Sequence, residues 1–212
     1  MPRIRDQRPY NVAYYARNRE TEIARVKRRQ NERIELLRDV RRVPCEDCRG
    51  QFEPWQMDFD HRNPEAKSFE IGRRGPYVSR KRLLLEIRKC AIVCANCHRV
   101  RTLVQHRARL AGRELVGSSR GIERRREHWR ANAALLDQLR DVPCFDCGGT
   151  FPPCAMEFDH RDPNTKVEDV TRLISKGRRR MLEEAAKCDI VCTNCHRNRT
   201  YVRRRGGVTG RE

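Results

Sequence analysis

The sequence contains no apolar run that approaches the length needed to span a bilayer. Its basic stretches also lack the large apolar faces of helices that anchor at a membrane surface. These absences exclude membrane roles. No apolar signal segment follows Met1. We therefore expect a cytoplasmic protein in a reduced compartment, where eleven cysteines serve purposes other than disulfide bonding.

Apolar residues are also scarce, at 37% of 212 positions, which suffices for one modest domain or two small ones. Small domains bury too little apolar surface to be stable without help, and they usually add disulfides, a metal or a partner. Because disulfides are not expected here, a bound metal is the predicted source of extra stability.

Acidic residues are outnumbered, with 29 Asp and Glu against 48 Lys and Arg, so the formal net charge is +19. Nucleic acid is the natural partner for such a chain, because each cation that neutralises a phosphate releases a counterion. The alternative is a ribosomal or merely solvated basic surface, which charge alone does not exclude.

One pattern of cysteine, aspartate and histidine occurs twice. The first copy consists of Cys45, Cys48, Asp60, His61, Cys94, Cys97 and His98, and the second of Cys144, Cys147, Asp159, His160, Cys192, Cys195 and His196. The offset is 99 residues from Cys45 to Cys144 and 98 from Cys94 to Cys192. A whole unit is therefore duplicated, with one residue lost between its cysteine pairs.

Each copy contains two CxxC hooks, and four thiolates at this local spacing are typical of a closed tetrahedral zinc site. We expect structural zinc in both copies, in preference to a redox dithiol. Cys90, Cys188 and Cys154 are left outside these sites, and Cys90 is expected to be a buried small apolar residue. Cys90 as a ligand in place of another cysteine stays open, because strand alternation puts it on the same side as Cys94.

The histidines point to a second kind of metal. Four of the six lie in the repeated motifs, where an Asp-His pair ends a predicted short strand and a Cys-His pair begins a helix. One carboxylate, one free imidazole and one metal-binding imidazole around a cation make a hydrolytic site. In a regular strand Asp60 and His61 would point to opposite faces, so the strand is expected to break before Pro64.

The motifs FDHR and IVCANCHRVRT, with their copies FDHR and IVCTNCHRNRT, resemble the HNH endonuclease family and its zinc-knuckled ββα-metal fold. The resemblance covers roughly residues 43–104 and 142–202. It implies that His61 and His160 are general bases that activate water. It further implies that Asp60 with His98, and Asp159 with His196, bind a catalytic Mg²⁺ or Mn²⁺.

The resemblance also implies contacts to phosphate and products with a 3′-hydroxyl and a 5′-phosphate. The arginines concerned are Arg62, Arg99, Arg101, Arg161, Arg197 and Arg199. One feature of that family is missing. The asparagine that its members often have before the second strand would fall near Lys89 and Lys187, where this sequence has none. Asn96 and Asn194 lie inside the second hook and are not obvious substitutes.

The predicted fold is α+β, with two small zinc-stapled ββα-metal modules, each preceded by a basic α-helix. The predicted segments are a basic arm and helix at 1–42, the first module at 43–107, a linker at 108–121, a basic helix at 122–141, the second module at 142–205 and a flexible tail at 206–212. Apolar residues at helical spacing, Ile23, Val26, Ile34 and Leu37, predict one long basic helix over 18–39. One face of this helix could pack against the zinc module and another could lie along a phosphate backbone.

The leading hypothesis is a metal-dependent DNA endonuclease with two HNH-type active sites in one chain, a monomer acting as an internal pseudo-dimer. The competing hypothesis is a non-catalytic zinc-module protein that binds nucleic acid and keeps relic sites. RNA cleavage stays open as a third, because phosphate contacts do not distinguish the two sugars.

Overall fold

The structure is a computed structural model that describes residues 8–110 and 120–206. The start of the predicted arm at 1–7, the middle of the predicted linker at 111–119 and the tail from 207 lie outside the described residues. The chain divides into two compact units. The first is formed by Met1–Val43 with Phe59–Ala91 and the second by Pro44–Asp58 with Ile92–Glu212.

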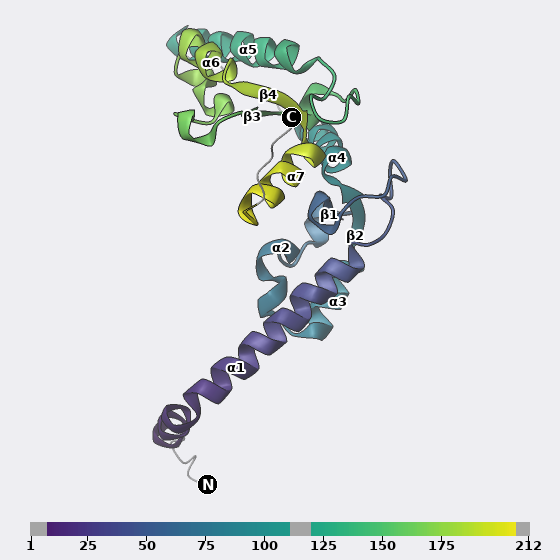
Figure 1. Cartoon of the computed structure of the whole chain (residues 1–212), viewed down its shortest axis with the longest axis vertical. Helices are drawn as coiled ribbons and strands as arrows, with labels where there is room; N and C mark the ends of the chain where they lie inside the picture. The colour runs from purple at the N-terminus through teal and green to yellow at the C-terminus, as the bar shows by residue number, and fades with distance from the viewer. Residues whose placement is uncertain (1–7, 111–119, 207–212) are drawn as a thin grey trace. The chain divides into compact units, whose positions relative to one another are not determined.

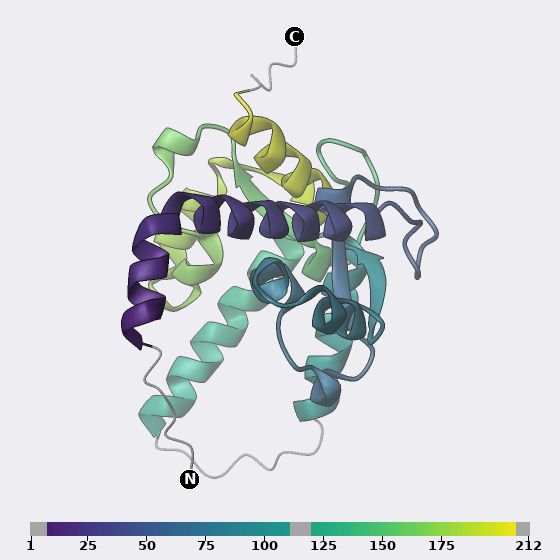
Figure 2. The same cartoon turned by 90° about the horizontal axis from the view of Figure 1, so that it is seen from below.

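The first unit contains the long helix α1 (Arg8–Val40) and two shorter helices, α2 (Ile71–Arg74) and α3 (Arg80–Ile87). Figure 2 shows that α1 bends toward its N-terminal end. Only its C-terminal turns reach a core, where Leu37 packs with Ile71 and Leu83. Ile23 and Val26 are exposed. The predicted basic helix is therefore present and is longer than expected, and part of its apolar stripe is exposed.

Each copy of the repeat contains one pair of strands. Strand β1 (Met57–His61) pairs with β2 (Cys90–Cys94), and β3 (Met156–His160) pairs with β4 (Cys188–Cys192). The second pair is antiparallel, with Met156 opposite Cys192 and His160 opposite Cys188. Both β1 and β3 end at the histidine of the Asp-His pair, as the prolines that follow in the sequence predict.

The second unit places its second strand pair among helices. Figure 1 shows the β3–β4 sheet with α5 (Arg120–Arg140) and α6 (Arg178–Ala185) on one side and α7 (Thr193–Arg204) on the other. Leu136 of α5 and Met181 of α6 are fully buried in the core there. A 3₁₀ helix, η6 (Val170–Ser175), completes this core. The result is a mixed α+β module that contains a small antiparallel sheet.

The helix before each cysteine cluster belongs to the repeated unit. Leu37 of α1 and Leu136 of α5 hold equivalent buried positions. Arg41 lies over the ring of Phe59 at 4.6 Å, and Arg140 lies over Phe158 at 4.8 Å. Cation–π contact at both positions ties the end of the helix to the strand that carries the Asp-His pair.

The edges of the predicted linker are helical. Helix α4 (Ala95–Leu110) continues past residue 107, and α5 begins at Arg120. The predicted linker at 108–121 is therefore too long at both ends, because residues 108–110 and 120–121 belong to helices. None of the helices in the described part of the chain is long and apolar enough to cross a membrane.

Helices α4 and α7, which belong to different modules, meet inside the second unit through matched residues. The backbone N–H of Asn194 donates to the side-chain oxygen of Asn96 at 3.0 Å, and the reverse bond measures 3.4 Å. Trp55 stacks on Tyr201 with ring centroids 3.6 Å apart. The paired asparagines make the contact locally two-fold, as in an isologous dimer interface.

Candidate functional site

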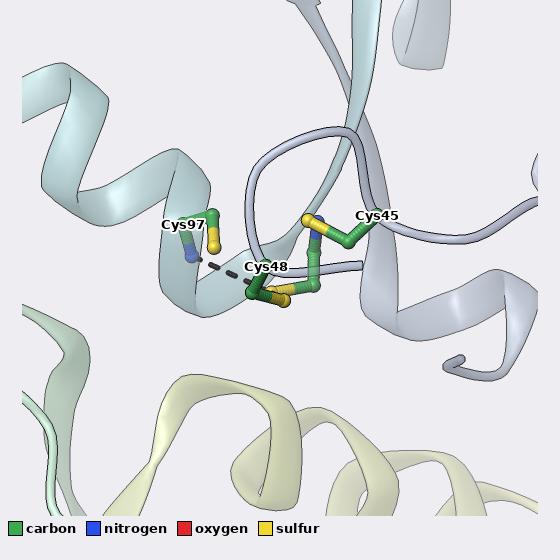
Figure 3. A group of neighbouring side chains, drawn as sticks. Cys45, Cys48 and Cys97 are labelled. Atoms are coloured by element: carbon green, nitrogen blue, oxygen red, sulfur yellow. Dashed lines mark hydrogen bonds between the residues drawn. The ribbon is translucent and has the colours of Figure 1, made fainter. Parts of the chain in front are cut away.

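Two clusters of four cysteines form within the second unit. One consists of Cys45, Cys48, Cys94 and Cys97, and the other of Cys144, Cys147, Cys192 and Cys195. In each cluster all four sulfur atoms lie within 4.8 Å of one another. The edge of a tetrahedron with Zn–S bonds of about 2.3 Å is about 3.8 Å, so both clusters suit structural zinc. Figure 3 shows the sulfur atoms of Cys45, Cys48 and Cys97 gathered at one place.

The local backbone prepares the thiols for a metal. The N–H of Cys94 donates to the sulfur of Cys45, and the N–H of Cys192 donates to Cys144, both at 3.2 Å. A hydrogen bond from Cys195 lowers the pKa of the Cys192 thiol to about 5 and raises the pKa of Cys195 in turn. Such sharing of protons between thiols favours a divalent cation that replaces them.

Cys90 and Cys188 lie outside both clusters. Each is buried, and its thiol donates to the backbone oxygen of Glu86 or Glu184 at 3.5 Å. Burial raises the pKa of both thiols to about 11. They therefore stay protonated and pack as small apolar groups, as the sequence predicts for Cys90. Cys154 lies away from both clusters, beside the cavity described below.

The predicted general bases are backed by carboxylates that sequence reasoning missed. Nε2 of His160 lies 2.8 Å from Oε1 of Glu184, and Nε2 of His61 lies 2.9 Å from Oε1 of Glu86. Both histidines and both glutamates are buried. The repeated sequence E-x-x-K-C, at 86–90 and 184–188, carried the signal that would have identified them.

The environment of these glutamates keeps them ionised. Burial raises the pKa of Glu184, but hydrogen bonds from Lys187, the Val167 backbone and His160 outweigh it and lower the pKa to about 2. The pKa of Glu86 is lowered to about 2 by the equivalent contacts. An ionised carboxylate accepts the Nε2 proton, so the basic lone pair of each imidazole is placed on Nδ1.

Lys89 and Lys187 each donate to the glutamate of their module, at 2.8 and 2.7 Å. They hold the carboxylate that orients the imidazole. Asn96 and Asn194 are used elsewhere, in the contact between the modules.

The predicted metal-binding histidines are also oriented by carboxylates. Nδ1 of His98 lies 2.8 Å from Oδ2 of Asp58, and Nδ1 of His196 contacts Glu157. A carboxylate behind a histidine is the usual support for a metal ligand. Asp58 and Glu157 occupy equivalent positions before the Phe-Asp-His sequence, and sequence reasoning missed both.

The structure brings Asp159 and His196 together. Nε2 of His196 lies 3.3 Å from Oδ1 of Asp159, a separation that two ligands of one octahedral cation also have. Asp159, His160 and His196 line the same cavity of about 610 Å³. Hydrogen bonds to Asp159 and Glu157 raise the pKa of His196 to about 9, although burial lowers it. An imidazole must be neutral to bind a metal, so a cation here would have to displace the proton that His196 shares with these carboxylates, and the metal role of Asp159 and His196 stays a prediction.

Asp159 is also held by two arginines. Arg203 of α7 donates to both carboxylate oxygens, at 2.9 and 2.6 Å, and Arg199 donates to Oδ2 at 2.8 Å. Burial raises the pKa of Asp159, but hydrogen bonds from His196 and the two arginines hold it far below its usual range. The negative charge of this predicted metal ligand is already matched by guanidinium groups.

The other predicted phosphate contacts are engaged within the protein. Arg197 forms two hydrogen bonds to Asp58 at 2.9 and 2.7 Å, and Arg99 contacts Glu157. Each therefore reaches across to the carboxylate that orients the other module's histidine. Arg101 pairs with Asp47 and Arg199 with Asp146 of the cysteine hooks.

Two further arginines complete the predicted phosphate set. Arg161 is exposed but donates to the Cys188 backbone at 2.9 Å, and Arg62 is exposed. The phosphate role of all six arginines stays a prediction.

Comparison with protein-family models, with curated proteins and with solved structures finds no match to this chain.

Proposed function

We propose that this protein is a metal-dependent DNA endonuclease of the HNH type, which hydrolyses phosphodiester bonds with histidine as general base. The observation that carries the proposal is the repeated pairing of each Asp-His histidine with a buried, ionised glutamate, at 2.8 Å for His160 and 2.9 Å for His61. A histidine held in this way has the tautomer and orientation that a general base needs.

In the proposed reaction, His61, with His160 as its counterpart, accepts a proton from the attacking water at Nδ1. Glu86 or Glu184 stabilises the imidazolium that forms, because its carboxylate lies on Nε2. His98 and Asp60, with counterparts His196 and Asp159, supply the ligand atoms for Mg²⁺ or Mn²⁺. When bound, that cation offsets the charge that develops on the departing oxygen.

Nucleic acid as the substrate is supported by the net charge of +19 and by the surface of α1. The described exposed basic residues of this helix are Arg17, Arg19, Arg25, Lys27, Arg28, Arg29 and Arg38. A run of exposed cations on a helix suits a phosphate backbone and gives affinity without base specificity. Low sequence specificity is therefore part of the proposal.

The test uses zinc-loaded protein with supercoiled plasmid and Mg²⁺ or Mn²⁺, with EDTA as control. Wild type is expected to nick the plasmid, and the double variant His61→Ala with His160→Ala to lose about 10²- to 10⁴-fold in rate. The affinity of the double variant for DNA, measured by fluorescence anisotropy, should stay within about twofold because phosphate binding does not use these imidazoles. Absence of metal-dependent cutting by wild type, on plasmid and on RNA, would contradict the proposal.

A non-catalytic role in nucleic-acid binding is the second candidate, and the arginines on Asp159 favour it. A carboxylate matched by Arg199 and Arg203 is suited to holding α7 against β3. For a pure binding protein the plasmid stays supercoiled in every sample while anisotropy still reports binding.

A further inference from the structure

We infer that a phosphate group of the nucleic-acid backbone binds in the cavity beside His160, on the guanidinium of Arg140 at the end of α5. This inference rests on the proposed function, which supplies nucleic acid as the ligand. It deepens that function by naming a binding residue outside the six predicted arginines. The cavity, Arg140 and His160 all belong to the second unit.

The first step is the balance of charge in this cavity of about 610 Å³. Its lining includes four arginine and lysine side chains and three carboxylates, namely Arg99, Arg140, Lys166 and Arg203 with Glu157, Asp159 and Asp169. Each carboxylate is paired with one of these cations, Arg203 with Asp159, Arg99 with Glu157 and Lys166 with Asp169. Arg140 is therefore the lining cation that no lining carboxylate matches.

The second step is that Arg140 is poorly matched by the rest of the protein. Its Nη1 donates to Asp137 at 3.3 Å, but the Asp137 side chain is 61% exposed and does not line the cavity. Within the described part of the chain, no hydrogen bond is made by Nε of Arg140, although this atom is buried. Buried donors are nearly always paired in folded proteins, so an unpaired one beside a cavity points to a ligand.

The third step is what it costs the protein to hold this charge. The Arg140 side chain is 12% exposed, and burial lowers its pKa, although Asp137 raises it. The carboxylate of Glu157 attracts the same charge, and the guanidinium of Arg99 repels it. A buried charge without full compensation is destabilising, and an oxyanion that enters the cavity compensates it. Phosphate suits this role because its oxygens accept two parallel hydrogen bonds from one guanidinium.

The fourth step is the position of Arg140 relative to the proposed general base. Its guanidinium lies over Phe158, 4.8 Å from the ring centroid, and Phe158 lies two residues before His160 on β3. The repeat preserves this arrangement, since Arg41 lies 4.6 Å from the ring of Phe59. The aromatic contact holds the guanidinium in the cavity that the imidazole of His160 also lines. A phosphate on Arg140 is thereby held beside that imidazole.

A purely structural role for Arg140 is the competing explanation. A cation in the last turn of a helix interacts favourably with the final carbonyl groups, and the contact with Phe158 adds to stability. Both effects would be lost in Arg140→Gln whether or not phosphate binds. The number of phosphates that the protein neutralises is therefore the quantity that separates the two explanations.

The experiment measures the affinity of zinc-loaded protein for a short DNA duplex by fluorescence anisotropy at several salt concentrations. Each phosphate contact contributes about 0.9 to the slope of log Kd against log salt concentration. Arg140→Gln is expected to lower this slope by about 0.9, and Arg140→Lys, which keeps the charge, to retain it. Arg130→Gln is the matched control, because it removes one charge from an exposed position on the same helix, and it should leave the slope unchanged.

A second pair of variants leaves Arg140 in place and keeps the test decisive if Arg140→Gln does not fold. Thr171 is exposed and lines the cavity, whereas Thr150 is exposed and does not line it. Thr171→Glu adds a carboxylate that compensates the unmatched cation. It is expected to weaken duplex binding about fivefold relative to Thr150→Glu at about 0.15 M salt, the effect of losing one phosphate contact.

An unchanged slope for Arg140→Gln, or an equal fall for Arg130→Gln or Arg140→Lys, would overturn the inference. Equal affinities of Thr171→Glu and Thr150→Glu would overturn it too. In each of these cases, metal-dependent nicking of plasmid by wild type leaves the proposed function standing. A fall in slope for Arg140→Gln alone, without nicking by wild type, supports the phosphate site and contradicts the proposed function.

Discussion

At the scale of single residues, the first cysteine hooks of the two modules share a left-handed backbone position but fill it with different residues. Arg49 and Gly148 both follow the second cysteine of a hook, and both adopt left-handed backbone angles, with φ of 60° and 68°. Glycine accepts this conformation without steric cost, whereas arginine does not. At the next position glycine is needed for space, since a Cβ at Gly149 would lie 2.9 Å from the ring of Phe151.

We predict that Arg49→Gly raises the free energy of unfolding by about 0.5–1 kcal/mol, since it removes the left-handed strain while glycine's extra chain entropy offsets part of the gain. Gly148→Arg should lower it by a similar amount. Urea unfolding of zinc-loaded protein, followed by circular dichroism, measures both. A loss of stability in Arg49→Gly would show that the arginine side chain contributes more than its backbone costs.

At the scale of elements, one glutamate joins three segments in each module. Glu184 of α6 accepts from His160 of β3, from the backbone of Val167 and from Lys187 before β4. Glu86 of α3 makes the equivalent contacts to His61, Ser68 and Lys89. Each proposed general base is thereby oriented by a glutamate that lies 24 or 25 residues away in sequence.

We predict that Glu86 and Glu184 make the free energy of unfolding fall in acid. Their pKa in the folded protein is about 2, below the ordinary 4.5, so their contribution is present above about pH 4.5 and is lost as the pH falls toward 2. Each should contribute about 2 kcal/mol less at pH 3 than at pH 5.

Unfolding of wild type, Glu86→Gln and Glu184→Gln between pH 5 and pH 3 measures the effect. The difference between proteins is the useful quantity, because zinc release affects all of them alike. Parallel curves for wild type and both variants would contradict the role given to these carboxylates.

At the scale of the whole second unit, the modules hold each other through side chains. Trp55 of the first module stacks on Tyr201 of the second at an interplanar angle of 6°, and its indole N–H donates to Asn198 at 3.4 Å. Arg197 and Arg99 cross over to Asp58 and Glu157. The repeat therefore behaves as a dimer within one chain, in which each half supports the other's candidate site.

We predict that Trp55→Ala lowers the free energy of unfolding by about 2 kcal/mol, because it removes a stacked aromatic pair and the surface that the pair buries. The chain offers a matched control in its other tryptophan, since Trp129 on α5 is 50% exposed. Trp129→Ala should change stability by less than about 0.5 kcal/mol. Equal effects of the two variants in urea unfolding would mean that the stack contributes little to the unit.

The sequence by itself determined the parts that depend on local spacing. The CxxC hooks predicted two four-cysteine clusters, and the structure assembles both. Alternation and the following prolines predicted strands that end at His61 and His160, and helical spacing predicted α1, α5 and the helices after each Cys-His pair. These features were predictable because each is encoded within a few consecutive residues or by an exact repeat.

Only the tertiary structure decided which distant groups meet. Glu184 lies 24 residues from His160 and Arg203 lies 44 residues from Asp159, and no local pattern announces either contact. Whether Ile23 and Val26 are buried likewise depends on which part of α1 packs against another segment, and the structure leaves both exposed. The two modules share the same motif residues, but the ion pairs that surround Asp159 form only when folding brings distant side chains together.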